Sequence, residues 1–272
     1  MIRINAEKCV RCHACIRDCV VAILQPGADG VPVLAPELER FCLNCQHCLA
    51  VCPAEAVVCN GVSAVDCPPA GELPEPEKMG NLIRQRRSIR HYKDENIDPE
   101  AMKMLLDHLA WSPTGCNDHS LYFAVVQDKA EMVFFRETVG KMLNFLIRWK
   151  ILQLLYPNVR RFLEEIRNGE DVIFRRAPHM IVAAVPGKAP CKYADPWIAL
   201  TQFDLLAQSL GIGTCWCGFA VYALRWSRKM RDRLQIPAGY KIGGVLLFGK
   251  ADVSYRRGTR PAPFPGQNGK TL

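Results

Sequence analysis

The chain has 272 residues, 49% of them hydrophobic, and carries 14 cysteines and a formal net charge of +8. This length allows one good-sized hydrophobic core and a small satellite domain. No helix-turn-helix, zinc-finger or aromatic RNA-binding signature accompanies the positive charge, so we do not expect a nucleic-acid partner.

The charge is unevenly distributed along the chain. Lys and Arg number 5 against 6 Asp and Glu in residues 1–59, 1 against 4 in residues 60–80, and 29 against 17 in residues 81–272. The three parts therefore carry net charges of −1, −3 and +12. A basic body joined to a weakly acidic amino-terminal part predicts recognition of a phosphate-bearing cofactor or of an acidic redox partner.

Eight cysteines near the amino terminus form two copies of one spacing, C-x2-C-x2-C-x3-C. The first copy is Cys9, Cys12, Cys15 and Cys19, and the second is Cys42, Cys45, Cys48 and Cys52, followed by Pro53. This run resembles that of bacterial ferredoxins with two 4Fe-4S clusters, in which the fourth cysteine of each run ligates the other cluster. The resemblance assigns Cys9, Cys12, Cys15 and Cys52 to one cluster, and Cys42, Cys45, Cys48 and Cys19 to the other.

A disulfide framework and zinc knuckles are the alternatives for these cysteines. The first run follows Met1 closely, without the apolar stretch of a secretory signal peptide, and six further cysteines lie outside the runs. Both features favour a reducing cytoplasm over disulfides. Zinc knuckles use paired C-x2-C motifs and four ligands, which leaves the third cysteine of each run unexplained.

The cysteine runs also suggest how the chain is divided. We expect residues 1–59 to form a small ferredoxin-like domain of two half-repeats, whose clusters act as its core and which unfolds without iron and sulfide. Residues 60–80 include Pro68, Pro69, Pro74 and Pro76 and several glutamates, a composition that predicts an extended, semi-rigid linker. Residues 81–272 then form the second domain.

The first half of this second domain shows three elements. Asp98, Pro99 and Glu100 predict a helix with an N-cap and a proline in its first turn. Residues 121–127 predict a strand. Residues 133–166 are apolar and basic at helical spacing, which predicts a helical pair that covers a pocket or a dimer seam. A membrane span is not expected, because charged residues interrupt the apolar run.

The second half continues with helices and strands that do not alternate regularly. Residues 179–185 predict a buried strand, and Asp195 with Pro196 predicts a capped helix that ends at Gly211 and is buried on most sides. Residues 223–234 predict a basic helix, and residues 243–249 a strand. The irregular order favours an α+β fold over a doubly wound sheet.

Four segments of the second domain carry its chemistry. Three arginines and a serine fall within residues 86–90. This pattern is typical either of a solvated basic face or of a phosphate-binding site, because the forked guanidinium group of arginine binds phosphate through two hydrogen bonds. The run 86–92 resembles the opening motif of the nitroreductase family of flavin enzymes. Residues 112–119, 210–219 and 255–261 are similar to that family's small-residue loop, its flavin-facing segment and its phosphate-binding tail. With the cysteine runs, the chain resembles the ferredoxin-nitroreductase fusions of anaerobic microbes.

The resemblance implies an α+β sandwich that binds FMN and a set of cofactor-binding positions. These positions are Arg86, Arg87, Ser88, Arg90, Ser112, Pro113, Thr114, Asn117, Cys217, Gly218, Arg257 and Arg260. Arg86 and Ser88 would hold the FMN phosphate and ribityl chain with help from Arg257 and Arg260, and Arg90 would lie near the pyrimidine edge. Asn117 would bind the ring, and the Cys217–Gly218 backbone would face N5. Cys116 and His119 depart from the family pattern.

The predicted function is that of a cytoplasmic, FMN-dependent oxidoreductase with two 4Fe-4S clusters. The resemblance implies a homodimer with FMN at its interface, an external donor such as ferredoxin, and a small planar acceptor such as a nitroaromatic or a quinone. No side chain is nominated as a catalytic acid or base, because the cofactors supply the chemistry. A non-catalytic electron carrier or redox sensor is the alternative, and reductive dehalogenation or flavin destruction a third possibility.

Overall fold

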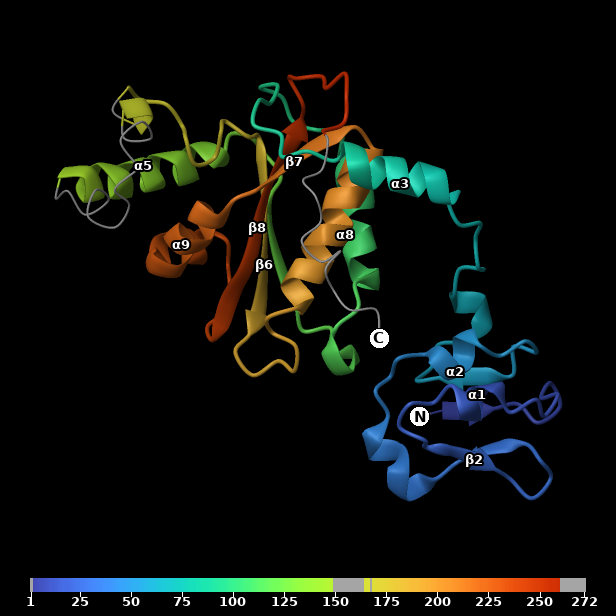
Figure 1. Cartoon of the computed structure of the whole chain (residues 1–272). Helices are drawn as coiled ribbons and strands as arrows, with labels where there is room; N and C mark the ends of the chain where they lie inside the picture. Colours follow the sequence, from blue (N-terminus) through green and yellow to red (C-terminus); the bar gives the residue numbers. More distant parts are fainter. Residues whose placement is uncertain (1, 149–163, 167, 260–272) are drawn as a thin grey trace, which may run out of the picture. The chain divides into compact units, whose positions relative to one another are not determined.

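The computed structural model describes residues 2–148, 164–166 and 168–259 (Figure 1). The chain divides into two compact units. The first comprises Met1–Leu73 with Cys116–Asp118, and the second comprises Pro74–Gly115 with His119–Leu272. Each unit is built around its own apolar centre.

The amino-terminal unit contains two short antiparallel sheets and two one-turn helices. Strand β1 (Ile2–Ile4) pairs with β4 (Val57–Cys59), and β2 (Leu24–Pro26) pairs with β3 (Pro32–Leu34). Helices α1 (Ala14–Arg17) and α2 (His47–Ala50) are accompanied by two short 3-10 turns, Pro36–Phe41 and Ala64–Asp66. Helix α2 follows α1, and β4 follows β2, at the same distance along the chain. The unit is therefore a structural duplication, as the repeated cysteine spacing predicts.

The second unit is built on a four-stranded antiparallel sheet in the order β5-β6-β8-β7. Its strands are β5 (Tyr122–Val126), β6 (His179–Pro186), β7 (Ile212–Trp216) and β8 (Tyr240–Lys250). Seven of the eight residues of β6 are buried. Because successive side chains point to opposite faces of a sheet, Met180 and Val182 join one core while Ile181 and Ala183 join the other.

Helices cover both faces of this sheet (Figure 1). Helices α4 (Pro99–Asp107) and α8 (Asp195–Ser209) pack on one face through residues such as Leu105, Leu200 and Phe203. Helices α5 (Met132–Arg148), α9 (Gly218–Trp226) and α10 (Arg228–Arg233) cover the other, with Phe135 and Leu224 buried there. Helix α3 (Pro76–Gln85) precedes them. The α+β fold predicted for this part of the chain is confirmed.

Most of the elements predicted for this unit are present, but three details differ. Asp98 caps α4 as predicted, accepting hydrogen bonds from the N–H groups of Glu100 and Ala101. Asp195 does not cap α8, because it is the first helical residue and its carboxylate accepts from Gly115 N–H at 3.1 and 3.2 Å. The basic helix predicted over 223–234 is broken at Ser227, whose side chain caps α10. Helix α3 occupies part of the segment predicted to be extended.

Two further expectations concern burial and membrane insertion. Helix α8, predicted to be buried on most sides, has an exposed side in the single chain, where Trp197 is 50% exposed. The helical pattern of residues 133–166 yields α5, while residues 149–163 lie outside the described part. Within the described residues, no helix combines the length and the hydropathy that crossing a bilayer requires.

Candidate flavin site and cysteine centre

The arginine-rich segment 86–92 lies along the edge of the sheet, beside β7. Ser88 forms a parallel bridge with Thr214, and the N–H of Ile89 donates to the Thr214 carbonyl at 2.8 Å. Tyr92 bridges to Ala251 just beyond β8. The sheet therefore fixes the main chain of the motif. The orientation of its arginine side chains depends on the contacts that each of them makes.

The side chain of Ile89 anchors the motif in this position. Ile89 is 5% exposed and rests on the bare Cα of Gly213 in β7. A Cβ at residue 213 would lie 2.6 Å from Cγ1 of Ile89 and 2.9 Å from its Cβ, too close for two carbon atoms. A glycine at this point of β7 is thus what allows the motif to approach the strand.

A buried carboxylate lies behind the motif. Asp204 of α8 is 2% exposed, and one of its oxygens accepts from the hydroxyl of Thr214. Its other oxygen accepts from Trp216 Nε1 at 3.3 Å and from Arg86 Nη1 at 3.5 Å. A buried charge needs hydrogen bonds and a counter-charge to be tolerated, and these three groups supply both. Asp204 therefore positions Arg86, although the sequence reading did not single it out.

Two predicted site residues hold buried polar atoms without a partner among the described residues. Arg87 donates through Nη1 to the carbonyls of Arg84 and Arg86, both at 2.7 Å, while its Nη2 is buried and unpaired. Ser112 is 2% exposed, and its Oγ is also unpaired. Buried polar groups are nearly always satisfied in proteins, so unpaired donors indicate a place for a ligand or ordered water.

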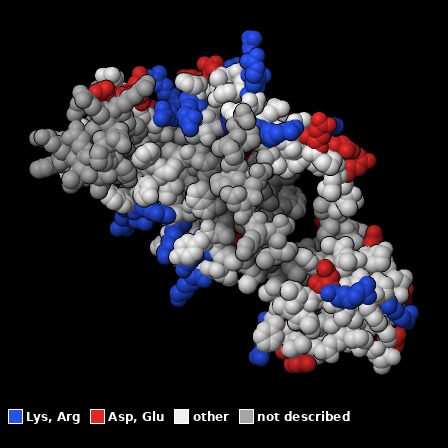
Figure 2. Space-filling model, viewed as in Figure 1, with Lys and Arg blue, Asp and Glu red and all other residues white. Residues whose placement is uncertain are grey.

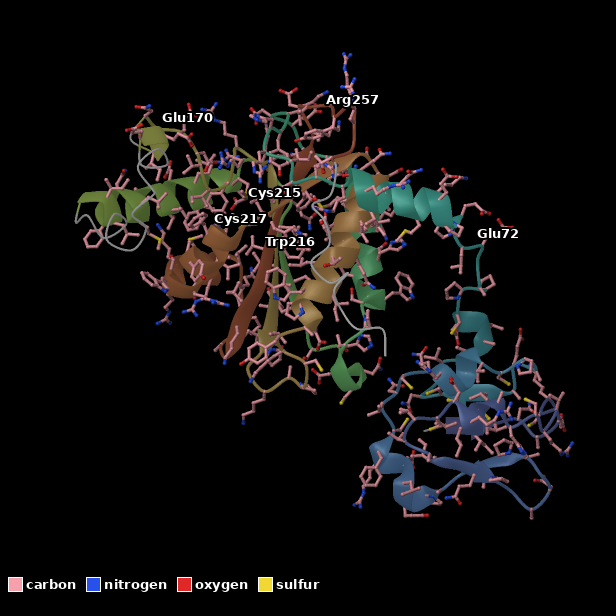
Figure 3. All side chains as sticks on the ribbon, viewed as in Figure 1. Glu72, Glu170, Cys215, Trp216, Cys217 and Arg257 are labelled. Atoms are coloured by element: carbon pink, nitrogen blue, oxygen red, sulfur yellow. The ribbon has the colours of Figure 1, made fainter. Side chains whose placement is uncertain are left out.

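The carboxy-terminal arginines approach the same region. A cavity of about 310 Å³ is lined by Ile89 and Gly213, and also by Tyr255, Arg256 and Arg257. Figure 3 shows Arg257 at the upper edge of this unit. The structure thus brings the first motif, the start of β7 and the tail together, three segments that are far apart in the sequence. Arg260 lies outside the described residues.

Cys217 lies where β7 passes into α9 (Figure 3), and Gly218 is the first residue of α9. The backbone N–H of Cys217 already donates to the carbonyl of Val245 at 2.9 Å, so it serves the sheet. Its thiol donates to the Ile173 carbonyl at 3.4 Å, and burial raises the pKa of that thiol to about 12. Cys217 is therefore an inert core thiol. The backbone N–H of Gly218 is the other donor that was predicted to face N5 of the flavin.

The loop 112–119 has an unusual backbone. Cys116, Asn117 and His119 all adopt positive φ angles of 55°, 54° and 45°. The hydroxyl of Thr114 accepts from the N–H of His119 at 3.0 Å, and Pro113 is exposed. Residues Cys116–Asp118 are grouped with the amino-terminal unit, where the Asn117 amide donates to the carbonyls of Leu43 and Asn44. Left-handed geometry at non-glycine residues is costly and concentrates at functional loops.

In the amino-terminal unit, the two cysteine runs have matching backbone conformations. Arg11 and His13 in the first run have positive φ, and so do Asn44 and Gln46 at the corresponding places of the second. His13 and Gln46 are also the N-cap residues of α1 and α2. Left-handed residues can turn neighbouring N–H groups toward a common concave surface that suits anions, including iron–sulfur centres.

The fourth cysteine of the second run joins the first three. Cys9, Cys12, Cys15 and Cys52 together line a small cavity. Backbone N–H groups donate to two of these sulfurs, from Arg11 to Cys9 at 3.4 Å and from Ala56 to Cys52 at 3.3 Å. Burial, and to a lesser degree the nearby Cys52, raise the pKa of Cys15.

The second run contains one buried cysteine and one that lines a cavity. Cys48 is buried, and burial raises the pKa of its thiol to about 12, with Cys45 among the neighbouring groups. Cys42 lines a second cavity, of about 180 Å³, together with Ile2 and Asn60. Across the described parts of the chain, no group of three or more Cys, His, Asp or Glu side chains is arranged to hold a single metal ion.

Comparison with known proteins decides the family of the second unit. The profile of the nitroreductase family matches residues 83–250, more than half of the chain. The chain belongs to the nitroreductase family. A protein of Archaeoglobus fulgidus, provisionally named NADH dehydrogenase/NAD(P)H nitroreductase, is 28% identical over 181 residues, which are 64% of this chain and 85% of the relative.

Two crystal structures of nitroreductases share this fold. That from Desulfitobacterium hafniense has a TM-score of 0.55 and 24% identity, covering 72% of this chain and 97% of the relative. That from Bacteroides fragilis has the same TM-score with 19% identity, covering 68% of this chain and 95% of the relative. The nitroreductase match begins beyond the cysteine runs, so it identifies the second unit alone.

Proposed function

We propose that this nitroreductase-family protein is an iron–sulfur flavoprotein. In this proposal, two 4Fe-4S clusters receive single electrons from an external donor such as a ferredoxin. FMN delivers them to a small planar acceptor such as a nitroaromatic or a quinone. The family match supports the oxidoreductase class, and the two crystallised nitroreductases contain bound FMN.

The residues of the second unit fit FMN. The observation that carries this assignment is the cavity beside β7, which Ile89 of the 86–90 motif and Arg257 of the tail both line. Arg86, Arg87, Ser88 and Arg257 would hold the phosphate and ribityl chain, because guanidinium groups bind phosphate through paired hydrogen bonds. The unpaired Nη2 of Arg87 gives one such donor. FMN would supply transfer of electron pairs, and the protein would bind and orient it.

The other predicted contacts complete this assignment. Arg90 would lie at the pyrimidine edge, where a cation stabilises negative charge on the reduced ring. Ser112, with its buried unpaired Oγ, and the neighbouring Pro113 and Thr114 would border the ring. The Gly218 backbone would donate to it. Asn117, the other predicted donor, would have to give up its hydrogen bonds to the carbonyls of Leu43 and Asn44 in order to bind the ring. Figure 2 shows Lys and Arg side chains gathered in several groups on the second unit, a charge distribution that attracts anionic ligands.

The amino-terminal unit would hold the two proposed cubane clusters. Cys9, Cys12, Cys15 and Cys52 would ligate one, as their shared cavity supports. Cys42, Cys45, Cys48 and Cys19 would ligate the other. The backbone N–H groups that donate to Cys9 and Cys52 are hydrogen bonds of the kind that set the potential of such clusters.

We also propose a homodimer with FMN at its interface. Helix α9 exposes Tyr222 and Trp226, at 59% and 74% of their surface, on one side of the single chain. Exposed aromatic side chains four residues apart on a helix are typical of a surface that is covered by a partner.

Anaerobic reduction of the reconstituted protein tests the proposed electron path. One equivalent of reduced ferredoxin should bleach the cluster absorbance and then the flavin absorbance, whereas NADH should act slowly. If NADH reduces FMN at once, even in the Cys12→Ala and Cys45→Ala variants that lack intact clusters, the clusters are not the electron inlet. Flavin reduction without turnover of any nitroaromatic or quinone would indicate an electron carrier.

A further inference from the structure

The loop that precedes β6 touches two parts of the candidate flavin site. Near its start, the carbonyl of Ile173 accepts a hydrogen bond from the Cys217 thiol at 3.4 Å, where β7 passes into α9. At its end, Pro178 and Tyr92 both pack over Gly249 of β8. A Cβ at residue 249 would lie 2.5 Å from Cγ of Pro178 and 3.2 Å from Cδ1 of Tyr92. Because Tyr92 closes the arginine motif, the loop runs from the predicted flavin-facing segment to that motif.

Two consecutive arginines in the middle of this loop have a left-handed backbone. Arg175 and Arg176 have φ angles of 54° and 55°. The Asp171 carboxylate holds this turn, since it accepts from the N–H of Phe174 at 2.9 Å and from that of Arg176 at 3.0 Å. Arg136 of α5 in turn forms an ion pair with Asp171 at 3.4 Å. Such angles are costly at residues with a Cβ and concentrate at functional sites, so the turn fixes a particular direction for its side chains.

The two side chains have different surroundings. Arg176 is exposed and forms an ion pair with Glu170 at 3.4 Å. Arg175 is half-buried, and its guanidinium group forms no hydrogen bond or ion pair with any described residue. A guanidinium group carries five N–H donors and a permanent charge, and one that is partly removed from water calls for an anion. Arg175 therefore has the character of a ligand-binding group, and Arg176 that of a surface residue.

The charge of Arg175 acts on the same groups as two arginines of the 86–90 motif. Burial raises the pKa of the Cys215 thiol, and the positive charges of Arg90, Arg175 and Arg86 oppose this rise. Burial also raises the pKa of Cys217 to about 12, and Arg175 is among the charges near that thiol. These neighbours agree with the hydrogen bond that attaches the loop to Cys217.

We propose that Arg175 binds an anionic group of the electron acceptor, so that the preferred substrate is a planar molecule that carries a carboxylate. The inference rests on the proposed function, because it presumes that FMN is bound beside β7 and that the acceptor stacks on it. The arginines of the 86–90 motif and Arg257 serve FMN in that proposal, which leaves Arg175 for the acceptor. A guanidinium group binds a carboxylate through two parallel hydrogen bonds, which would also orient the acceptor on the ring.

Ligand binding to the oxidised, FMN-loaded full chain tests the inference without turnover. Benzoate and its neutral counterpart benzamide are titrated separately, and the change in flavin absorbance is recorded. The wild-type protein should bind benzoate about tenfold more tightly than benzamide. Arg175→Gln should bind benzoate about tenfold more weakly than the wild type and benzamide equally well. Arg175→Lys should fall between the two, because lysine keeps the charge but not the forked geometry.

Oxidation of the reduced protein gives a second readout. The protein is reduced with stoichiometric dithionite and mixed anaerobically with 4-nitrobenzoate or 4-nitrobenzamide, and the return of oxidised flavin absorbance is timed. In Arg175→Gln, the ratio of the rate with the acid to the rate with the amide should fall about tenfold. Arg176→Gln is the matched control, since it changes the neighbouring left-handed arginine, and it should keep the wild-type ratio. FMN content and midpoint potential should be the same in every variant.

Three results would overturn the inference while leaving the proposed function in place. The first is a wild-type protein that binds benzoate no more tightly than benzamide. The second is an Arg175→Gln protein with wild-type affinity for benzoate. The third is an Arg175→Gln protein that loses FMN or changes its midpoint potential, which would make Arg175 a ligand of the flavin. A wild-type chain that holds no FMN would overturn the proposed function itself.

Discussion

The contact between Gly213 and Ile89 makes the position of the arginine motif sensitive to a single methyl group. In Gly213→Ala, the new Cβ would lie 2.6 Å from Cγ1 of Ile89, which is 0.8 Å short of the 3.4 Å at which ordinary contact begins. Ile89 is buried, and its N–H is bonded to the Thr214 carbonyl, so it cannot move without shifting the motif. Overpacking of this kind costs about 1–3 kcal/mol.

The expected result is loss both of stability and of FMN affinity. Denaturant unfolding, followed by tryptophan fluorescence, should show a free energy of unfolding of the second unit lowered by about 1–3 kcal/mol. FMN titration should show weaker binding. The dissociation constant should rise about tenfold for each 1.4 kcal/mol of strain that is still present in the protein when FMN is bound.

A second substitution shows whether Ile89 is the cause. Ile89→Ala alone should cost about 2–5 kcal/mol through the cavity that it leaves. In Gly213→Ala/Ile89→Ala, the new methyl group occupies part of that cavity. The loss in free energy of unfolding of this double variant should therefore be smaller than the summed losses of the two single variants by about 0.5–3 kcal/mol. Gly80→Ala in α3, where an added Cβ meets nothing within 4 Å, is the control. Additive costs, or a Gly213→Ala protein as stable as wild type, would refute the reasoning.

Two further predictions concern buried polar groups. Burial lowers the pKa of His179, whose Nε2 accepts from Ile97 N–H at 3.0 Å. Stability should therefore fall as the pH drops below about 6.5, where the unfolded histidine gains a proton that the folded one does not. His179→Gln should flatten this part of the curve in pH-dependent unfolding, and equal slopes in both proteins would contradict the prediction. Asp204→Asn should lower the free energy of unfolding by about 3 kcal/mol and weaken FMN binding, because Arg86 loses its buried partner. Calorimetry measures the change in stability, and FMN titration measures the change in affinity. An unchanged FMN affinity would argue against the positioning of Arg86 by Asp204.

Local patterns were sufficient for the elements whose signals lie within a few residues. The continuous apolar run of β6, the cap of α4 by Asp98 and the positive φ of Gly211 after α8 all follow from neighbouring residues. The spacing of the cysteines likewise predicts the duplicated loops of the amino-terminal unit. The prediction of one continuous basic helix over residues 223–234 was wrong, because the composition of this segment does not reveal that Ser227 ends α9 and caps α10.

The sequence by itself therefore determined several helices and strands of the second unit, the repeated cysteine runs and the motifs of the nitroreductase family, but it did not predict β7 or α3. Only the tertiary structure decided which groups meet. Arg86 and Asp204 are 118 residues apart, and no periodicity connects them. The need for glycine at 213, which Ile89 imposes, also depends on a contact between distant segments. Such contacts arise when the sheet and its helices bury their apolar faces together, a condition that no local pattern records.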